Sequence, residues 1–412
     1  MSTELFTPLA LRSGLVLRNR IGKAAMEEGL AGHAQLPDER LIRLYERWGA
    51  GGAGMLVTGN VMVHKEALTG PRGVVLDADA PLEPFERWAA VGKAGGAAMI
   101  MQISHPGRQV RANMPGVSWG PSAVSLEMGK LSKRFRPPTA MTSDQIDETL
   151  HRFVVSAVKA EQAGFDGVEI HGAHGYLLSQ FLSPLANRRT DAWGGSLEDR
   201  ARLLLEIVEA VRASVSPSFT VAVKLNSADF QRGGFDEADA QQVIAMLEPL
   251  GVDLVELSGG SYESPAMSGR PSDDRTMARE AYFLDLAADL ATTSAIPLML
   301  TGSISQRDTA EKVLANGVSV IGMATALAVT PDLADRWQAG EDVHRRLRPV
   351  TWTDKALASA ASMALVRYQL RRIARGKDPA LGTRPWFAFG CDNADQNRAL
   401  RRYRAWLQEV TS

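Results

Sequence analysis

Short apolar segments alternate with longer helical segments along most of this chain, and this alternation constrains the fold more than any other feature. The apolar segments lack polar alternation, as expected of strands that are buried on both faces of a parallel sheet. They span residues 21–25, 55–58, 98–103, 167–170, 220–225, 254–257, 296–300 and 320–323. Eight successive βαβ units without a reversal predict a closed (β/α)8 TIM barrel rather than an open sheet.

The intervening segments carry helix start signals. Thr142 and Gln145 have the spacing of a capping box, and Ser196 can cap the next long helix. The run GAGGAG at residues 49–54 contains a G-x-G-x-x-G pattern, but it follows a helical segment and precedes a strand. Because a dinucleotide-binding loop has the reverse order, we interpret these glycines as a helix-to-strand turn.

The length of 412 residues suggests two or three average domains, but a barrel with insertions can hold most of the chain as one unit. We expect residues 1–340 to form the barrel. Residues 104–141, after the third strand, form a long loop with several prolines, which is typical of a lid or binding loop, although a surface insertion fits equally well. Residues 341–412 are expected to form a C-terminal helical extension packed on the barrel.

Composition argues against several classes of protein. The chain has 46 Lys and Arg against 47 Asp and Glu, so it lacks the basic excess of a nucleic-acid binder. Its single cysteine, Cys391, can form neither an intramolecular disulfide nor an iron–sulfur cluster. The longest apolar stretch, residues 321–329, is too short to cross a membrane, and the N-terminus has no signal-type apolar core. We therefore expect a cytoplasmic protein, whose arginine-rich C-terminal helices could form a homo-oligomer interface.

Residues 168–200 concentrate polar side chains at the end of the fourth predicted strand. His171, His174 and Tyr176 lie there, on the face where barrel enzymes place their chemistry. Two histidines three residues apart with no third ligand nearby do not favour a metal site, and we predict none. As neutral imidazoles they could donate hydrogen bonds to a carbonyl oxygen; alternatively, backbone groups could satisfy both rings.

This segment closely resembles the signature of the old yellow enzyme family, FMN-dependent ene-reductases on a (β/α)8 barrel. The shared residues are the run H-G-A-H-G-Y-L followed by Q-F-L-S-P, N-x-R-T-D, G-G-S and E-x-R, and the similarity extends from Asn19 to about Leu333. The resemblance implies that NADH or NADPH reduces FMN, which then passes hydride to the β-carbon of an activated alkene. It also implies that His171 and His174 bind the substrate carbonyl oxygen and that Tyr176 gives a proton to the α-carbon.

The resemblance assigns several flavin contacts. Gln102, ending the third strand, corresponds to the glutamine that pairs with the pyrimidine edge of the flavin; a buried glutamine satisfied by backbone is the alternative. Lys224, on the fifth strand, stands where the family usually has arginine and would stabilise negative charge on reduced flavin. A surface or ion-paired lysine is the competing interpretation. Ala25 and Met26 align with the small residue or proline, and the methionine, that follow the first strand in the family.

Two positions depart from the family pattern. Glu27 occupies the place of a threonine or cysteine that hydrogen-bonds the flavin, and an ionised carboxylate cannot donate that bond. We expect Glu27 to be protonated by burial or turned toward the substrate or a cation. Ala324 and Thr325 replace a glycine–arginine pair, so main-chain N–H groups and the Thr325 hydroxyl would hold the phosphate. The predicted phosphate site comprises Thr301, Gly302, Ser303, Gly322, Ala324 and Thr325.

The 104–141 loop and a second loop at 259–280, which carries Tyr262 and Arg270, are expected to shape the substrate pocket and the nicotinamide site. Three other functions stay open at this point. A flavin-dependent amine oxidase or demethylase on the same barrel is one, although the single cysteine argues against the cluster-bearing kind. A flavin-free lyase or aldolase could use Lys224 as a Schiff-base amine, and a non-catalytic phosphate-ligand binder is the third.

Overall fold

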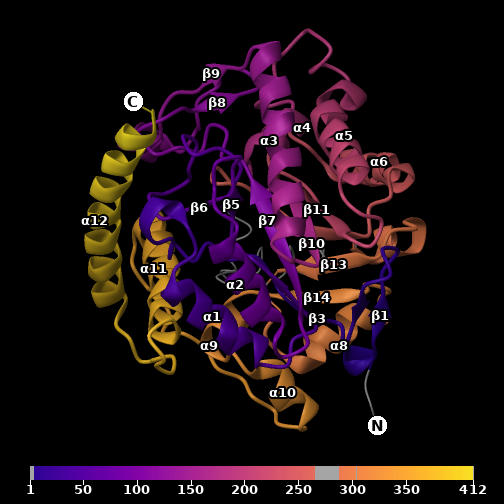
Figure 1. Ribbon diagram of the computed structural model, residues 1–412, viewed down its shortest axis with the longest axis vertical. Helices are drawn as coiled ribbons and strands as arrows, with labels where there is room; N and C mark the ends of the chain where they lie inside the picture. The colour runs from indigo at the N-terminus through magenta and orange to yellow at the C-terminus, as the bar shows by residue number, and fades with distance from the viewer. Residues whose placement is uncertain (1–3, 265–286, 303, 412) are drawn as a thin grey trace.

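Eight parallel strands close into a barrel in the computed structural model, which describes residues 4–264, 287–302 and 304–411 (Figure 1). The chain order around the barrel is unbroken, and pairing of the third barrel strand with the fourth completes the circle. The barrel strands are β3 (Ile21–Lys23), β4 (Met55–Val57), β7 (Ala98–Ser104), β10 (Gly167–Gly172), β11 (Thr220–Asn226), β12 (Leu254–Ser258), β13 (Leu298–Thr301) and β14 (Val320–Met323). The predicted (β/α)8 fold is confirmed.

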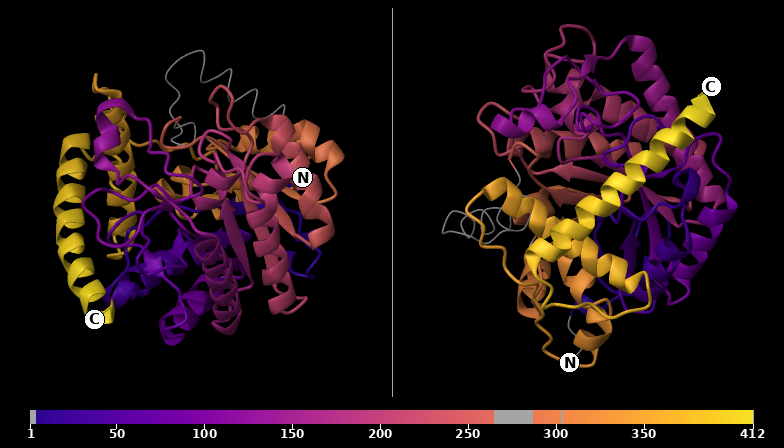
Figure 2. Two further views of the ribbon diagram at one scale, coloured as in Figure 1. Left: turned by 90° about the horizontal axis from the view of Figure 1, so that it is seen from above. Right: turned by 90° about the vertical axis from the view of Figure 1, so that its left-hand side faces the viewer.

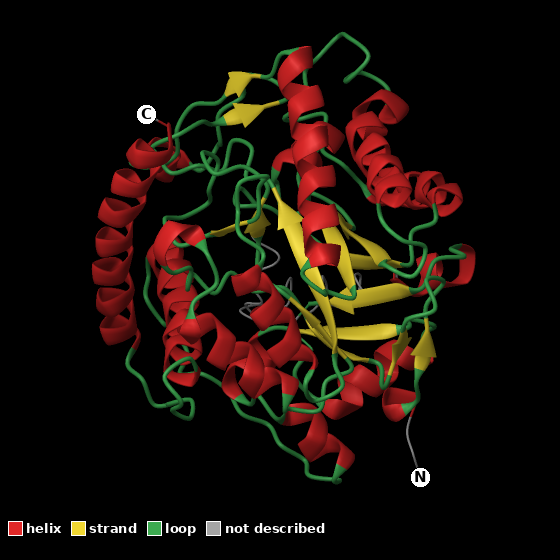
Figure 3. Cartoon of the chain, viewed as in Figure 1, coloured by secondary structure: helices red, strands yellow, loops and turns green. Residues whose placement is uncertain are grey.

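Helices surround the strands, as Figure 3 shows. They are α1 (Glu39–Gly49), α2 (Glu83–Lys93), α3 (Ser143–Gln162), α4 (Leu177–Leu182), α5 (Leu197–Ser214), α6 (Glu237–Leu247), α8 (Arg307–Ala315), α9 (Thr325–Val329) and α10 (Leu333–Gln338). Thr142 and Gln145 form the capping box of α3, and the Ser196 hydroxyl caps α5. The glycines at 49–54 make the turn between α1 and β4, as predicted. Short 3-10 turns lie at η1 (Glu4–Phe6), η2 (His33–Gln35) and η4 (Glu248–Leu250).

One strand boundary differs from its prediction for a clear physical reason. The apolar run at 296–300 was expected to be strand throughout, but β13 begins at Leu298. Pro297 precedes it and has no backbone N–H to donate to a neighbouring strand, so the ladder starts only after the proline. Its carbonyl still accepts a 3.1 Å hydrogen bond from the Val255 N–H, which keeps the approach aligned with β12.

Both faces of the barrel strands are buried, which explains why their sequences show no polar alternation. Side chains that point inward form a separate apolar cluster within the barrel, made of Leu17, Ala24, Met55, Val57, Ala98, Ile100, Ala222, Leu254, Met299 and Val320. The hairpin β1 (Leu9–Ala10) and β2 (Val16–Leu17) supplies Leu17 to this cluster. Outward side chains pack against the helices in a larger core. The polar residues considered below lie on the inner side of the strands, toward their carboxyl ends.

The long loop after β7 is more regular than the sequence suggests. It contains η3 (Gly129–Arg134) and the strands β8 (Trp119–Gly120) and β9 (Thr139–Ala140), which pair with each other. The preceding connection, after β4, adds β5 (Val61–Met62) and β6 (Val74–Val75), and β5 pairs with the end of β7. These short pairings extend the barrel wall on one side above the strand ends.

Two long helices, α11 (Lys355–Ile373) and α12 (Pro385–Thr411), follow the barrel. Helix α11 contacts α1 and α9, and α12 crosses the outside of the molecule over the early loops (Figure 2). Tyr403 and Leu407 of α12 pack in one apolar cluster with Met62 and Val110 from those loops, and the Tyr403 hydroxyl donates to the carbonyl of Lys65 at 2.7 Å. In the part of the chain that the structure describes, no helix is long and apolar enough to span a membrane.

Replacing Phe153 of α3 with alanine is expected to lower the free energy of unfolding by about 3–5 kcal/mol, because the ring is fully buried between helix and barrel. The matched control is Phe387→Ala on α12, whose ring is 44% exposed and which we expect to cost less than about 1 kcal/mol. Denaturant or thermal unfolding followed by circular dichroism measures both. Equal shifts would contradict the assignment of α3 to the core.

Candidate active site

The structure brings together the three residues predicted at the end of the fourth strand. His171 lies in β10, and its ring centroid is 4.8 Å from that of Tyr176 and 5.1 Å from that of His174. His174 has a φ of 61°, which is unfavourable for a residue with a side chain. Its backbone N–H donates to Asn226 Oδ1 at 3.0 Å and its carbonyl accepts from Gln109 Nε2 at 2.7 Å, so neighbouring loops hold this conformation in place.

Both histidines are held in the neutral form. Burial lowers the pKa of His171 well below its usual value, and the nearby His174 and Lys224 lower it further. Burial and the charge of Lys224 also lower the pKa of His174 well below its usual value. The Nδ1 of His171 accepts a 3.2 Å hydrogen bond from the Ala173 N–H, so the proton of the ring is on Nε2. His174 Nε2 contacts Ser258 Oγ at 2.7 Å. Each ring therefore uses one nitrogen on the protein and keeps the other for a ligand.

Tyr176 is almost completely buried, and its hydroxyl oxygen is 3.3 Å from that of Tyr262. Burial raises the pKa of Tyr176 well above its usual value, and Tyr262 and Glu27 raise it further. Burial, followed by the charge of Glu27, raises the pKa of Tyr262 to about 12. The two phenols are therefore protonated at neutral pH. Tyr262 was predicted as a pocket residue, and its hydroxyl lies beside that of Tyr176. Arg270, which was predicted together with it, lies outside the described residues.

Buried charges lie inside the barrel below these residues. Lys224 pairs in register with His171, and its Nζ is 2.5 Å from Glu256 Oε1, so the lysine is ion-paired and its contact with the flavin stays a prediction. Burial would raise the pKa of Glu256, but Lys224 overrides it and keeps the pKa below its usual value. Burial and the charge of Glu256 raise the pKa of Glu169, so this carboxyl is neutral. Neither glutamate was singled out from the sequence, because each resembles any other polar residue within a strand.

Gln102 is the first polar residue of β7 and lies opposite Glu169 in the β7–β10 register. Its backbone N–H donates to Thr58 Oγ1 at 2.9 Å and its Nε2 donates to Asn60 Oδ1 at 2.7 Å. Its Oε1 is buried without a hydrogen-bond partner, which is costly unless a ligand donates to it. This free acceptor and the cation of Lys224 fit the N–H and carbonyl groups of a flavin pyrimidine ring.

Glu27 lies half-buried after β3, following Ala25 and Met26, which are also half-buried. The Thr69 hydroxyl donates a hydrogen bond to its carboxylate. Burial opposes the charged form of Arg367, a residue of α11, but Asp392 and, after it, Glu27 raise the pKa of this guanidinium above its usual value. The Arg367 guanidinium is held by Asp392 of α12 through hydrogen bonds of 3.1 and 2.7 Å. The contact that the structure describes for Glu27 is the hydrogen bond from Thr69, so its orientation toward the substrate or a cation stays a prediction.

The ends of β13 and β14 lie side by side, because Thr301 pairs with Gly322. A Cβ atom at Gly322 would overlap the Thr301 hydroxyl, so this approach requires glycine. Ala324 precedes the first residue of α9, Thr325, whose side chain is exposed, and Gly302 is exposed as well. Ser303 lies outside the described residues. Main-chain groups of these two turns thus face one region, and their role in phosphate binding stays a prediction.

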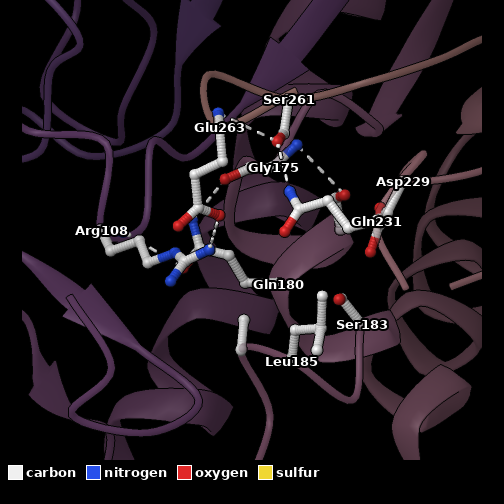
Figure 4. A pocket seen from close by; sticks show the side chains of 11 residues that line it. Arg108, Gly175, Gln180, Ser183, Leu185, Asp229, Gln231, Ser261 and Glu263 are labelled. Carbon is white, nitrogen blue, oxygen red and sulfur yellow. Dashed lines mark hydrogen bonds and ion pairs between the residues drawn. The ribbon is translucent and has the colours of Figure 1, made fainter. Parts of the chain in front are cut away.

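The two long loops are joined by an ion pair. Arg108 Nη2 is 2.6 Å from Glu263 Oε2, and both side chains are at least nine-tenths buried. Figure 4 shows this pair beside a polar pocket that also contains Asp229, Gln231 and Ser261. The pocket has a volume of only about 10 Å³, room for about one water molecule. The ion pair therefore fixes the two loops beside the site, and the pocket is too small to hold a substrate.

Comparison with known proteins identifies the family. Residues 4–343 match the NADH:flavin oxidoreductase / NADH oxidase family. This chain belongs to that family, the old yellow enzymes. A curated relative, the NADH-dependent flavin oxidoreductase iliE of Hypocrea jecorina (strain QM6a), is 38% identical over 348 residues, which cover 79% of this chain and 86% of the relative.

Solved structures agree with this family. A 2-naphthoyl-CoA reductase in complex with 2-naphthoyl-CoA is 27% identical with a TM-score of 0.75, and the match covers 82% of this chain and 52% of that protein. The old yellow enzyme homologue from Zymomonas mobilis, at 24% identity and a TM-score of 0.68, shares the fold over 82% of this chain and 94% of its own. The protein is thus a flavin oxidoreductase that uses FMN with NADH or NADPH as reductant.

Replacing Glu169 with glutamine is expected to stabilise this old yellow enzyme increasingly as the pH rises. In the unfolded chain Glu169 ionises near pH ~4.3, whereas its raised pKa keeps it protonated in the folded barrel, so folding requires proton uptake above that pH. The favourable contribution of Glu169 to the free energy of unfolding is complete at low pH and is lost as the pH rises. Glutamine avoids this cost, so we expect a gain of about 1 kcal/mol or more between pH 5 and 8.

Chemical denaturation at several pH values measures the effect, with the exposed Glu86→Gln as the control. A difference between variant and wild type that does not change with pH would show that Glu169 is ionised in the folded protein.

Proposed function

We propose that this flavoenzyme reduces α,β-unsaturated carbonyl compounds, with Tyr176 as proton donor. The observation that supports this most strongly is the convergence of two neutral histidines and a buried tyrosine beside Gln102 and Lys224. A neutral imidazole with a free N–H can donate to an oxygen that gains negative charge, and a buried phenol can supply a proton nearby. No other group of described residues combines these functions at the strand ends.

FMN would be held by Gln102, Lys224, Ala25 and Met26 at the ring, and its phosphate by the turns after β13 and β14 at Thr301, Gly302, Ser303, Gly322, Ala324 and Thr325. When bound and reduced by the nicotinamide, FMN supplies a hydride to the β-carbon of the alkene. The Lys224 cation, fixed by Glu256, favours negative charge on the pyrimidine side of the ring.

His171 and His174 would bind the carbonyl oxygen of the substrate. The protonated nitrogen of His171 is Nε2, and His174 presents Nδ1 because Ser258 occupies its Nε2. Negative charge develops on the carbonyl oxygen as the β-carbon is reduced, and preorganised donors stabilise that charge without reorganising. Burial, followed by smaller effects that include the charge of Lys224, keeps both rings neutral, so neither transfers a proton to the substrate before reduction.

Tyr176 would transfer its hydroxyl proton to the α-carbon. A phenol with a raised pKa is a weak acid, but a carbanion held within reach is a strong base. Burial excludes water from competing for this step. Tyr262 and Arg270 belong to the loop that we propose borders the substrate. The flavin-free lyase is not supported, because a Schiff-base amine must be neutral and Lys224 is paired with buried Glu256.

Replacing Tyr176 with phenylalanine tests the proposed proton donor. We expect the reduction of 2-cyclohexenone to slow by about 10²- to 10⁴-fold, because general acid catalysis contributes this much, while flavin reduction by NADH changes little. Anaerobic stopped-flow absorbance follows each half-reaction separately. Equal loss in both half-reactions would contradict the role of Tyr176.

Replacing Glu27 with threonine tests its proposed influence on the flavin. Removal of a carboxylate near the ring is expected to raise the reduction potential by about 30 mV or more, equal to roughly 1.4 kcal/mol for a two-electron couple. The potential is measured by spectroscopic titration against reference dyes, with Thr69→Ser as the control that keeps the hydroxyl. If potential, rate and their pH dependence are unaltered, Glu27 does not tune the flavin.

A further inference from the structure

His174 is held in a backbone conformation that residues with a side chain rarely adopt. Side chains three positions apart in an extended strand point to opposite faces, so His171 and His174 would face away from each other if β10 continued. The chain instead turns at His174, with a φ of 61°, and at Gly175, with a φ of 70°. The turn places the two histidine rings with their centroids 5.1 Å apart. Glycine adopts this left-handed conformation freely, whereas histidine needs contacts that hold it there.

Asn226, the last residue of β11, provides such a contact. Its Oδ1 accepts the 3.0 Å hydrogen bond from the His174 N–H, and the residue is buried. The orientation of the amide follows from its other partners, because Nδ2 donates to the carbonyl of Gly260 at 3.2 Å and a carbonyl can only accept. Nδ2 also donates to Asp229 Oδ1 at 3.2 Å. A barrel strand therefore presents a fixed acceptor to the backbone of His174.

Two further side chains hold His174 from other elements. Gln109 is buried in the long loop after β7, and its Nε2 donates to the His174 carbonyl at 2.7 Å. Ser258, the last residue of β12, contacts Nε2 of the His174 ring at 2.7 Å. The N–H, the carbonyl and the ring of His174 are thus each bound by a different element. Of these contacts, the one from Asn226 also ties the turn to the loop after β12, because the same amide binds Gly260.

Taking the proposed role of the two histidines as its basis, we infer that Asn226 is a positioning residue that holds His174 in the orientation needed to bind the substrate oxygen. Without the acceptor at Oδ1, the His174 N–H is left unpaired and the backbone can relax away from the left-handed region. Relaxation moves the His174 ring away from that of His171, so the carbonyl oxygen loses one of its two donors as negative charge develops. His171 keeps its place because it lies within β10.

The test removes this acceptor with Asn226→Leu, which puts an apolar side chain of similar size in place of the amide. Anaerobic stopped-flow with NADH and 2-cyclohexenone compares the FMN-loaded wild type, Asn226→Leu, His174→Ala and the double variant. Asn226→Leu is expected to slow alkene reduction by about 10- to 100-fold, because a small displacement of a catalytic group costs this much. In the His174→Ala background it is expected to slow the reaction by less than about threefold, because the ring that Asn226 positions is gone.

Binding measurements separate positioning from a general loosening of the fold. Cyclohexanone presents a carbonyl oxygen but has no C=C bond to reduce, so its Kd, measured from changes in flavin absorbance, reports on the two histidines. We expect this Kd to rise by about 10-fold in Asn226→Leu, whereas the Kd of FMN, measured by fluorescence quenching, changes by less than about threefold. A merely structural role would weaken the binding of both molecules.

Asn187→Leu is the matched control, because Asn187 is a buried asparagine that fixes a different turn. Its Nδ2 donates to the carbonyls of Phe181 and Trp193 at 2.8 and 2.7 Å. Any effect of Asn187→Leu on alkene reduction is expected to be the same in the wild-type and His174→Ala backgrounds. The same coupling to His174 in this control would show that the coupling is not specific and would overturn the inference.

The outcomes for Asn226 and for the histidines can be told apart. If Asn226→Leu slows alkene reduction equally in both backgrounds, or leaves the Kd of cyclohexanone unchanged, the inference about Asn226 is overturned while the role of the histidines stands. If His174→Ala alone does not slow alkene reduction, the proposed role of His174 and the inference both fail. Should Asn226→Leu not fold, Asn226→Ala takes its place in the same cycle with the same expected results.

Discussion

The parallel pairing of β10 with both β7 and β11 is the constraint on which the site depends. This register places Gln102, Glu169, His171 and Lys224 on the inner side of the barrel near the carboxyl ends of the strands. A shift of one residue in any of these strands would turn its polar side chains toward the helices. Barrel closure therefore sets the relative positions of the proposed flavin contacts before any loop contributes.

The interior of the barrel carries charge that is balanced locally. Lys224 neutralises Glu256, Glu169 avoids ionisation by holding its proton, and the neighbouring histidines stay neutral. Near the mouth, burial raises the pKa of Tyr262 most, the charge of Glu27 raises it further, and the charge of Arg367 from the C-terminal extension lowers it. An extension beyond the residues that match the family thus takes part in the electrostatics of the site.

The sequence predicts the barrel and the clustering of three site residues well, because both depend on patterns within short stretches of sequence. Apolar runs mark the strands, and His171, His174 and Tyr176 follow one of them directly. The missed residues depend on tertiary contacts instead. Asn226 is a single polar residue at the end of a strand, and Arg367 lies on a helix far along the chain from Glu27, so no spacing in the sequence links either to the site. The predicted start of β13 was wrong, because the prediction followed the apolar run and took no account of the missing N–H of Pro297.

The most direct test of the account follows the visible absorbance of the purified protein saturated with FMN under anaerobic conditions. The account predicts that NADH or NADPH bleaches the oxidised-flavin absorbance and that 2-cyclohexenone then restores it as the saturated ketone forms. A protein that does not bind FMN, or bound flavin that stays bleached after the alkene is added, would contradict the central claim.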